Sequence, residues 1–422
     1  MRILWVKVGG LWPPDRGGRL RSFHLISELS RRHEVSVVTT HGPDDDAPGL
    51  AAALPDCARV VSVPYRISKQ GTARFALELC RSWLSPLPVD LWKTRVPRLR
   101  QEVHRLLQAG GADVCVADFL VAAPNVPRGA SVPLVLFEHN VEHLIWARLC
   151  RTEPRWWRRM LLELEWRKMR RVEAQVCTRA SLVVAVSDPD LELLSRLAPR
   201  ARVRAIPTGV DTAYFSAARK PEVPTRLVFT GSMDWYPNED AILHFVESIL
   251  PAIQREVPDV TLTVVGRNPT RRLRDAVSGP GIIVTGTVDD VRPFIAESAV
   301  YVVPLRVGGG TRLKIFEALA MGKAVVSTAV GAEGLPLISG EHFVQADQPA
   351  DFARAVVKLL KDHEARERLG SAGRRLVEAR YSWAEVARRF ESHLVETVGR
   401  RHRPDVLSGA PVHGGESGSA ER

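Results

Sequence analysis

The sequence predicts an α/β protein of two domains, each with a parallel sheet covered by helices. Strand-like and helix-like segments alternate from the first residues onward, as in repeated β-α-β units. The alternation stops at a linker rich in proline and charge, at residues 218–225, and restarts after it. The chain has 422 residues, which is enough for two domains that each bury their own core.

The composition is that of an ordinary globular protein, with 45% hydrophobic and 25% charged residues. The net charge of +11 suits three kinds of anionic partner: nucleic acid, a membrane surface or a phosphorylated substrate. Because the chain has no zinc-finger, RNA-binding or basic–aromatic repeat pattern, we expect no nucleic-acid partner.

The cysteines and the apolar runs predict a cytoplasmic location. The five cysteines are odd in number, widely spaced and without a C-x-x-C pair, which argues against a disulfide framework or a zinc site. The first apolar run, 3–8, is too short for a signal peptide, and no run approaches the roughly 20 apolar residues of a membrane span. We expect a protein that is free in the cytoplasm or attached to the inner face of the plasma membrane.

The first half opens with a strand at 3–8, a glycine-rich loop at 9–18 and a helix at 19–32. The loop contains Gly17 and Gly18 but lacks the G-x-G-x-x-G pattern of a dinucleotide site, and a plain surface turn is one interpretation of it. Further strands are expected at 35–39, 58–63, 113–117, 132–137, 182–186 and 202–206, and further helices at 72–84 and 95–109.

The strand at 132–137 ends in Glu138, His139 and Asn140. Open parallel sheets bind their ligands at the carboxyl ends of the strands, so this position makes His139 a candidate functional residue. The alternative is a structural histidine, which is the more common role of a single histidine.

Residues 144–180 are predicted to be helical and have an unusual composition. The segment contains Trp146, Trp156, Trp157 and Trp166 together with many arginines. Aromatic and basic side chains on one amphipathic surface are typical of a helix that lies on an anionic membrane. The alternative is a long helix whose tryptophans and leucines pack on the sheet while its arginines face water. The sequence leaves both interpretations open.

The second half repeats the pattern of the first. A strand at 227–230 leads through a loop that begins with Gly231 and Ser232 into a helix at 239–250. Arg267 follows another apolar run, and Val288 follows a strand at 282–285. Helices are expected at 350–361, 364–380 and 382–398, and the glycine- and serine-rich residues 399–422 are expected to be disordered.

The most informative stretch is the run of three glycines at 308–310, between strands at 299–304 and 324–328. Thr311 fits the N-cap of a helix that follows. A glycine loop that leads into a helix N-terminus binds anions through its backbone N–H groups and the helix dipole. Lys314 and Arg312 could each add a positive charge for a phosphate.

Glu317 lies deeper in the same helix, where a carboxylate would not help to bind phosphate. Carboxylates accept hydrogen bonds, so a pair of hydroxyls such as those of a ribose is the fitting ligand. The alternative is a solvated helix residue that follows an ordinary turn. The whole arrangement, with two strands, three glycines and Lys314 around this carboxylate, favours a nucleotide site.

Residues 304–335, PLRVGGGTRLKIFEALAMGKAVVSTAVGAEGL, resemble the nucleotide-sugar site of the retaining glycosyltransferases of family 4, in particular the bacterial subgroup linked to surface polysaccharides and exopolysaccharides. The resemblance implies the GT-B fold, in which two Rossmann-like domains face an interdomain cleft. It assigns the acceptor to an N-terminal domain (1–210, with a returning helix at 382–398) and the donor to a C-terminal domain (211–381).

The resemblance also implies a reaction. A hexosyl group would pass from a nucleoside diphosphate sugar to a glycan or polyprenyl-diphosphate-linked acceptor, with retention of configuration. We expect no metal and no cofactor besides the nucleotide sugar, because such enzymes generally lack the Asp-x-Asp metal site. The sequence names neither the donor sugar nor its base, nor the acceptor and its linkage.

Residue roles come from the same resemblance. Glu317 would hold the donor ribose, His139 would lie beside the anomeric carbon with Asn140 as its neighbour, and Lys314 would hold the diphosphate. The backbone at Val288 would read the base. The other residues expected to bind donor or acceptor are Gly17, Gly18, Gly231, Ser232, Arg267, Gly309, Gly310, Thr311 and Arg312.

Two features depart from the family pattern. Many members have a Glu at the position of Gly309 that reads the donor sugar, so the backbone amides of Gly309 and Gly310 would have to contact the sugar instead. The basic clamp that follows Gly231 in many members is missing, which leaves Arg267 and Lys314 as candidates. Two alternatives therefore remain open: a non-catalytic sugar-nucleotide or polysaccharide-binding subunit, or another GT-B enzyme such as a nucleotide-sugar epimerase.

Overall fold

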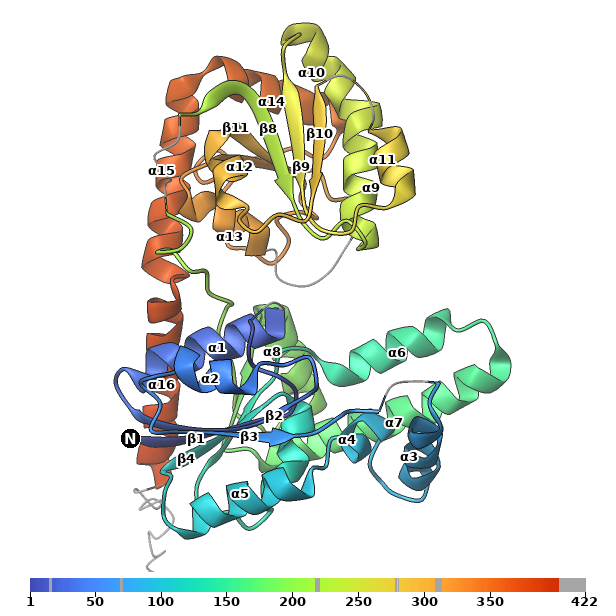
Figure 1. The fold of residues 1–422 in the computed structure, drawn as a ribbon, viewed down its shortest axis with the longest axis vertical. Coiled ribbons are helices and arrows are strands. Elements are labelled where there is room, and N and C mark those ends of the chain that lie inside the picture. The colour runs from blue at the N-terminus through green and yellow to red at the C-terminus, as the bar shows by residue number, and fades with distance from the viewer. Residues whose placement is uncertain are drawn as a thin grey trace, which may run out of the picture.

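A computed structural model describes residues 1–14, 17–68, 71–216, 221–277, 279, 281–307 and 313–401. It contains two parallel sheets, one in each half of the chain (Figure 1), as the alternating pattern predicted. The first has seven strands in the order β3-β2-β1-β4-β5-β6-β7, and the second has six in the order β10-β9-β8-β11-β12-β13. In both orders the first strand of each half is the third strand of its sheet and lies in the interior, which is typical of doubly wound sheets.

The first sheet consists of β1 (Arg2–Lys7), β2 (Glu34–His41), β3 (Arg59–Pro64), β4 (Val114–Asp118), β5 (Leu134–Phe137), β6 (Leu182–Ala185) and β7 (Val203–Ala205). Its helices are α1 (Gly17–Ser30), α2 (Ala47–Ala53), α3 (Ala73–Trp83), α4 (Val89–Lys93), α5 (Pro97–Gln108), the 3-10 helix η1 (Leu120–Asn125), α6 (Glu142–Thr152), α7 (Trp156–Arg179) and α8 (Asp188–Leu197). In β1, Leu4 shares a core with α5 and α7, whereas Trp5 points to the opposite face, beneath α1.

The second sheet consists of β8 (Val223–Thr230), β9 (Thr261–Val265), β10 (Ile282–Gly286), β11 (Ser298–Val303), β12 (Ala324–Ser327) and β13 (Val344–Gln345). Its helices are α9 (Tyr236–His244), the π-helical turn η2 (Phe245–Ile249), α10 (Leu250–Glu256), α11 (Arg271–Ala276), α12 (Arg292–Glu297), α13 (Leu313–Ala320), α14 (Pro349–Lys361) and α15 (His363–Arg380). The arrowheads of β8, β9 and β10 point toward the first domain (Figure 1), so the carboxyl ends of these strands lie on the side nearest to it.

The last helix, α16 (Trp383–Arg401), returns to the first domain, as expected. The chain crosses back where Val210 pairs with Ser382 in an isolated bridge. The Phe390 ring then lies 5.6 Å from the ring of Trp5 and 5.3 Å from that of Phe137. The helix runs three residues beyond the expected end at 398, and residues 402–422 of the expected disordered tail lie outside the described residues.

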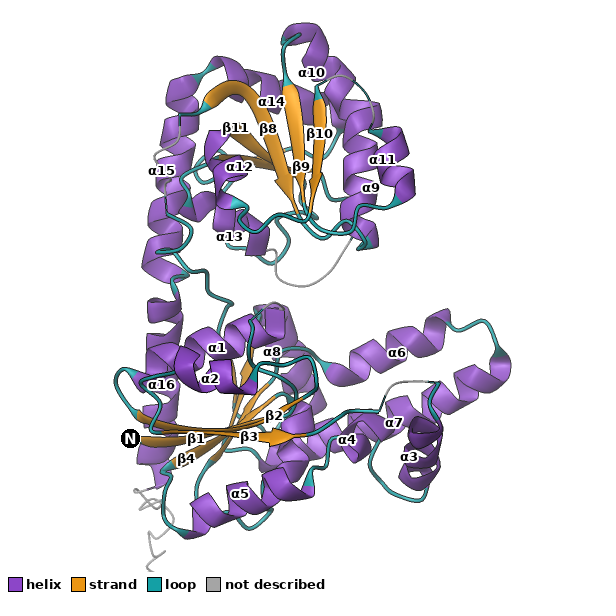
Figure 2. Ribbon diagram, viewed as in Figure 1, coloured by secondary structure: helices purple, strands orange, loops and turns teal. Residues whose placement is uncertain are grey.

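Two predicted helices were wrong in extent. The single helix expected at 144–180 is a pair, α6 and α7, because Pro154 lacks the N–H that a continuous helix needs. Figure 2 shows this pair projecting away from the first sheet. The helix expected at 239–250 begins at Tyr236 and opens into the wider turn η2 just before Pro251, which likewise cannot donate to the preceding turn.

Candidate functional site

Three side chains gather where β1, β4 and β5 end. The strand register places Lys7 opposite Asp118, and Asp118 opposite Phe137, two residues before His139. The Lys7 Nζ atom lies 3.1 Å from Asp118 Oδ2, and His139 Nε2 lies 2.8 Å from Asp118 Oδ1. All three side chains are buried, so Asp118 is a shared anionic partner that both neighbours need.

Arg21 of α1 fixes the tautomer of His139. Its Nη1 atom lies 3.1 Å from His139 Nδ1. A guanidinium group has only donors, so Nδ1 accepts this bond and the ring proton is on Nε2, which donates to Asp118. Arg21 Nη2 donates to the hydroxyl of Thr208 in the interdomain segment, and the Phe119 ring stacks on His139 at 3.7 Å.

The electrostatics of this cluster keep His139 neutral. Burial lowers the pKa of His139 to about 3, because it outweighs the attraction of Asp118 for the charged form. Burial alone would raise the pKa of Asp118, but Lys7 and His139 hold it below its ordinary value. Burial lowers the pKa of Arg21 to about 10, so Arg21 still carries its charge at neutral pH. A sugar could reach a ring nitrogen of His139 only if Arg21 or Asp118 moved.

Among the described glycines of the first loop, Gly18 lies against this cluster. A Cβ atom on Gly18 would lie 2.7 Å from Cζ of Phe119, so α1 can approach the His139 region because residue 18 is glycine. Gly17 is the exposed first residue of α1. Asn140 is also exposed, and its Nδ2 atom lies 3.4 Å from Glu142 Oε1 rather than within the His139 network.

A second cluster lies at the carboxyl ends of β8 and β9. Lys314 Nζ on α13 donates to Asn238 Oδ1 at 2.7 Å, and Asn238 Nδ2 donates to the backbone oxygen of Ser232 at 2.9 Å. Arg267 Nε donates to Ser232 Oγ at 3.0 Å. The structure thus brings together Ser232, Arg267 and Lys314, which the sequence placed on three separate segments.

Two glycines allow the loops of this cluster to touch. Gly231 N donates to the backbone oxygen of Val265, and a Cβ atom on Gly266 would lie 1.7 Å from the Gly231 oxygen. A Cβ atom on Gly231 itself would lie 2.9 Å from Lys314 Nζ. Larger residues at either position would separate the loops or displace the ammonium group.

Glu317 lies one turn after Lys314 on α13 and is partly buried. Burial raises the pKa of Glu317 to about 7, although the nearby charge of Lys314 opposes the shift. Lys314 Nζ also lies 4.1 Å from the centre of the Phe229 ring. Val288 is partly buried beside the same domain's core. Gly309, Gly310, Thr311 and Arg312 lie outside the described residues.

Sequence reasoning missed Lys7, Arg21, Asp118 and Asn238. A signal existed for two of them, because Lys7 and Asp118 are charged residues that end a strand directly after an apolar run. A charged residue at the carboxyl end of a central parallel strand lies at the edge of the sheet where open α/β proteins bind their ligands. Asn238 gave no local signal, since its partner Lys314 lies 76 residues away.

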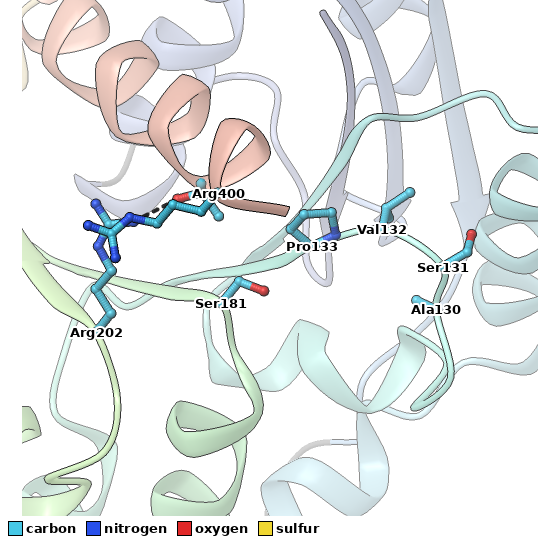
Figure 3. A pocket seen from close by; sticks show the side chains of 8 residues that line it. Ala130, Ser131, Val132, Pro133, Ser181, Arg202 and Arg400 are labelled. Carbon is cyan, nitrogen blue, oxygen red and sulfur yellow. Dashed lines mark hydrogen bonds between the residues drawn. The ribbon is translucent and has the colours of Figure 1, made fainter. Parts of the chain in front are cut away.

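A cavity in the described part of the chain lies elsewhere. It has a volume of about 570 Å³ and lies at the amino ends of β5 and β6, next to the end of α16 (Figure 3). Arg202 and Arg400 line it, and both form ion pairs with Glu396. None of the predicted site residues lines this cavity.

Two properties of the described residues bear on metals and membranes. No three His, Cys, Asp or Glu side chains within the described ranges are grouped so that they could hold a metal ion. Among the helices that the structure describes, none has the length and apolar character needed to cross a bilayer.

Both halves of the chain match glycosyltransferase families. Residues 17–214 match the family model described as Glycosyltransferase Family 4, and residues 224–362 match that described as Glycosyl transferases group 1. Solved structures of similar fold include HepE of Anabaena in complex with UDP (TM-score 0.65, 15% identity, 94% of this chain and 100% of that one). Sucrose-phosphate synthase of Thermosynechococcus elongatus is another (TM-score 0.64, 15% identity, 95% and 100%). The fold is therefore GT-B, as the sequence predicted.

Curated relatives are similar over part of their length. The chain is 32% identical over 203 residues to phosphatidyl-myo-inositol mannosyltransferase of Mycobacterium leprae, covering 46% of this chain and 53% of the relative. It is 26% identical over 226 residues to TuaH of Bacillus subtilis, a putative teichuronic acid biosynthesis glycosyltransferase, covering 48% and 54%. The chain thus spans about half the length of the curated relatives it matches, and the similarity is to glycosyltransferases.

Proposed function

We propose that the protein transfers a hexosyl group from a nucleoside diphosphate sugar to a glycan or lipid-linked acceptor, with retention, in the synthesis of surface or exported polysaccharide. The observation that carries this proposal is the chain of contacts from Lys314 through Asn238 and Ser232 to Arg267. These contacts place two cations at the carboxyl edge of a Rossmann-like sheet. Structures of HepE of Anabaena contain UDP and UDP-glucose, which fits a diphosphate at this edge.

The second domain would bind the donor. Lys314 and Arg267 supply the positive charges that the missing family clamp would provide, and the Gly231 loop allows the phosphates to approach the backbone closely. Glu317, as a carboxylate, would accept hydrogen bonds from the ribose hydroxyls. Fixed cations stabilise the diphosphate as it departs, because its negative charge grows in the transition state. No metal ion is required in this scheme, since Lys314 and Arg267 provide the charge.

The first domain would bind the acceptor beside His139. The neutral, oriented ring of His139 can contact the sugar once Arg21 releases Nδ1, and Arg21 adds a positive charge at this edge. No side chain is needed as a nucleophile, because the departing diphosphate can accept the proton of the acceptor hydroxyl on the same face. We propose the division into 1–210, with the returning helix, and 211–381 on the same grounds, and a location on the cytoplasmic side of the membrane.

A non-catalytic binding subunit is the second candidate. Gly309 in place of an acidic residue, and a His139 whose two ring nitrogens are both engaged by side chains, favour it. A nucleotide-sugar epimerase would also bind the donor but would need no acceptor.

Ligand-dependent thermal stability is the first test. A ligand that binds only the folded protein raises its stability by mass action, so a panel of UDP-, GDP- and TDP-sugars with the free nucleotides should give one clear responder. Turnover of that sugar nucleotide with a membrane or glycan extract then separates the candidates. Consumption that depends on the extract indicates the transferase, conversion without extract indicates an epimerase, and binding without turnover indicates a subunit. No stabilisation by any member of the panel would refute the donor site.

A further inference from the structure

Helices α3, α6 and α7 form a helical lobe, residues 73–84 and 142–179, beside the first sheet (Figure 1). Helices α6 and α7 pack along each other as a hairpin. Two contacts attach α7 to the segment around α3: Lys168 Nζ donates to the Ser82 oxygen at 2.8 Å, and Val89 N donates to Glu165 Oε2 at 2.6 Å. The lobe is therefore a defined structural unit.

Exposed apolar side chains concentrate on the helical lobe. Of the sixteen large apolar side chains that are exposed in the described part of the chain, nine belong to it: Leu77, Trp83, Leu84, Ile145, Leu149, Trp156, Trp157, Met160 and Leu164. Trp156 is 73% exposed and Leu84 is 92% exposed. Trp156, Met160 and Leu164 follow one line along α7, at a spacing of four residues. Such a concentration marks an interaction surface, whereas scattered exposed apolar residues do not.

The charge around these apolar groups is predominantly positive. Residues 142–179 contain ten Lys and Arg against five Glu. Eight arginines are exposed: Arg148, Arg151, Arg155, Arg158, Arg159, Arg167, Arg170 and Arg171. None of the five glutamates in this segment, all of them described, is exposed. The Arg158 guanidinium lies 5.0 Å from the ring of Trp157, so basic and aromatic groups alternate on the same surface.

We propose that the helical lobe docks on the surface of an anionic lipid bilayer. Tryptophan rings prefer the headgroup level of a membrane, and arginines beside them are attracted to anionic lipids. This mixture fits a bilayer better than an acidic protein, which would leave a broad apolar area uncovered. Trp146 and Trp166 pack against the core, as the core-packing interpretation predicts, whereas Trp156 and Trp157 face solvent, as docking on a membrane requires.

The lobe is joined directly to the candidate acceptor edge. Helix α6 begins three residues after His139, and Glu173 of α7 is buried against its first turn. Glu173 accepts bonds from the backbone N–H groups of Glu142 (2.8 Å) and His143 (3.0 Å), and its Oε2 atom lies 2.6 Å from His143 Nδ1. Docking of the lobe would thus hold the His139 edge near the membrane, within reach of a lipid-linked acceptor, a consequence that rests on the proposed function.

Vesicle flotation with the full chain tests the docking itself. We expect binding to vesicles of phosphatidylcholine mixed with phosphatidylglycerol, weak binding to pure phosphatidylcholine, and loss of binding when Trp156→Ala and Trp157→Ala are combined. Ile283→Ala with Ile338→Ala, two exposed apolar residues of the second domain, is the matched control and should bind normally. Because these side chains are exposed, unchanged thermal unfolding should verify the fold of each variant.

Charge variants give a second, quantitative readout. Arg158→Gln with Arg159→Gln should weaken binding to the anionic vesicles roughly thirtyfold, at about fivefold for each arginine near an anionic surface. Arg272→Gln with Arg274→Gln on α11 should not. Absence of vesicle binding, or equal binding by the lobe and control variants, would overturn the proposal, as would self-association through the lobe. Donor binding measured without vesicles should be unaffected, so failure of docking and failure of the transferase proposal remain distinguishable.

Discussion

Replacement of Glu317 by Gln should make the protein more stable and its nucleotide site weaker. The side chain is partly buried, and burial raises its pKa from 4.5 to about 7. This shift corresponds to at most about 3 kcal/mol of unfavourable free energy for the ionised form in the folded state. Below the unfolded pKa both states are protonated and no penalty exists. As the pH rises from about 4.5 to 7 the penalty develops, and above 7 it is complete.

Urea or thermal unfolding as a function of pH measures this penalty. We expect Glu317→Gln to match the wild-type protein near pH 4.5 and to exceed it at pH 8 by up to about 3 kcal/mol, or roughly 6–12 °C in Tm for a domain of this size. Nucleotide affinity should change in the opposite sense. Wild-type affinity should rise through pH 7 as the carboxylate forms, whereas the variant should bind weakly at every pH. A variant that is less stable than the wild type at pH 8 would refute the reasoning.

Three further variants test the two clusters. Lys314→Ala should weaken UDP and GDP binding by roughly 1.5–3 kcal/mol, the free energy of a charge-assisted hydrogen bond, whereas the surface variant Lys361→Ala should not. Equal nucleotide affinities of the Lys314→Ala variant and the wild-type protein, measured by calorimetry, would remove Lys314 from the site. Gly266→Ala should destabilise the protein by about 1–3 kcal/mol or more in urea unfolding, because its Cβ atom would overlap a backbone oxygen at 1.7 Å. The control Gly279→Ala should be neutral, because a Cβ atom there meets no atom within 4 Å. Asp118→Asn leaves a buried lysine without its counter-charge and should cost about 3–5 kcal/mol of stability in the same assay; a neutral result would contradict the buried ion pair.

The alternating pattern predicted both sheets because buried parallel strands have a strong local signature. Start and stop signals that were present were not all used. Ser187 caps α8 by accepting from Asp190 N, and Pro189 stands in its first turn, yet this helix was not predicted. Pro154 likewise marked the break between α6 and α7. These elements were predictable from capping and proline chemistry alone.

The candidate site could be proposed from the sequence only where its residues lie within one segment. His139 follows from its place at a strand end, and Lys314 and Glu317 follow from the glycine-to-helix motif. The ion pair of Lys7 with Asp118 depends on the register of two strands more than a hundred residues apart in the chain. Nor could the sequence show that Arg21 donates a hydrogen bond to Nδ1 of His139, because this contact forms only when α1 packs near the end of β5.

The path of α16 has a consequence for synthesis of the protein on the ribosome. Trp383, Phe390 and Leu394 complete the face of the first sheet that contains Trp5 and Phe137. Domains generally fold as they emerge, amino-terminal first. In the first domain, the part of this face that α16 covers instead stays exposed until the whole second domain has been translated. It is therefore the half of the chain that is more exposed to misfolding, and a chain truncated before residue 383 should fail first in the domain that is farthest from the cut.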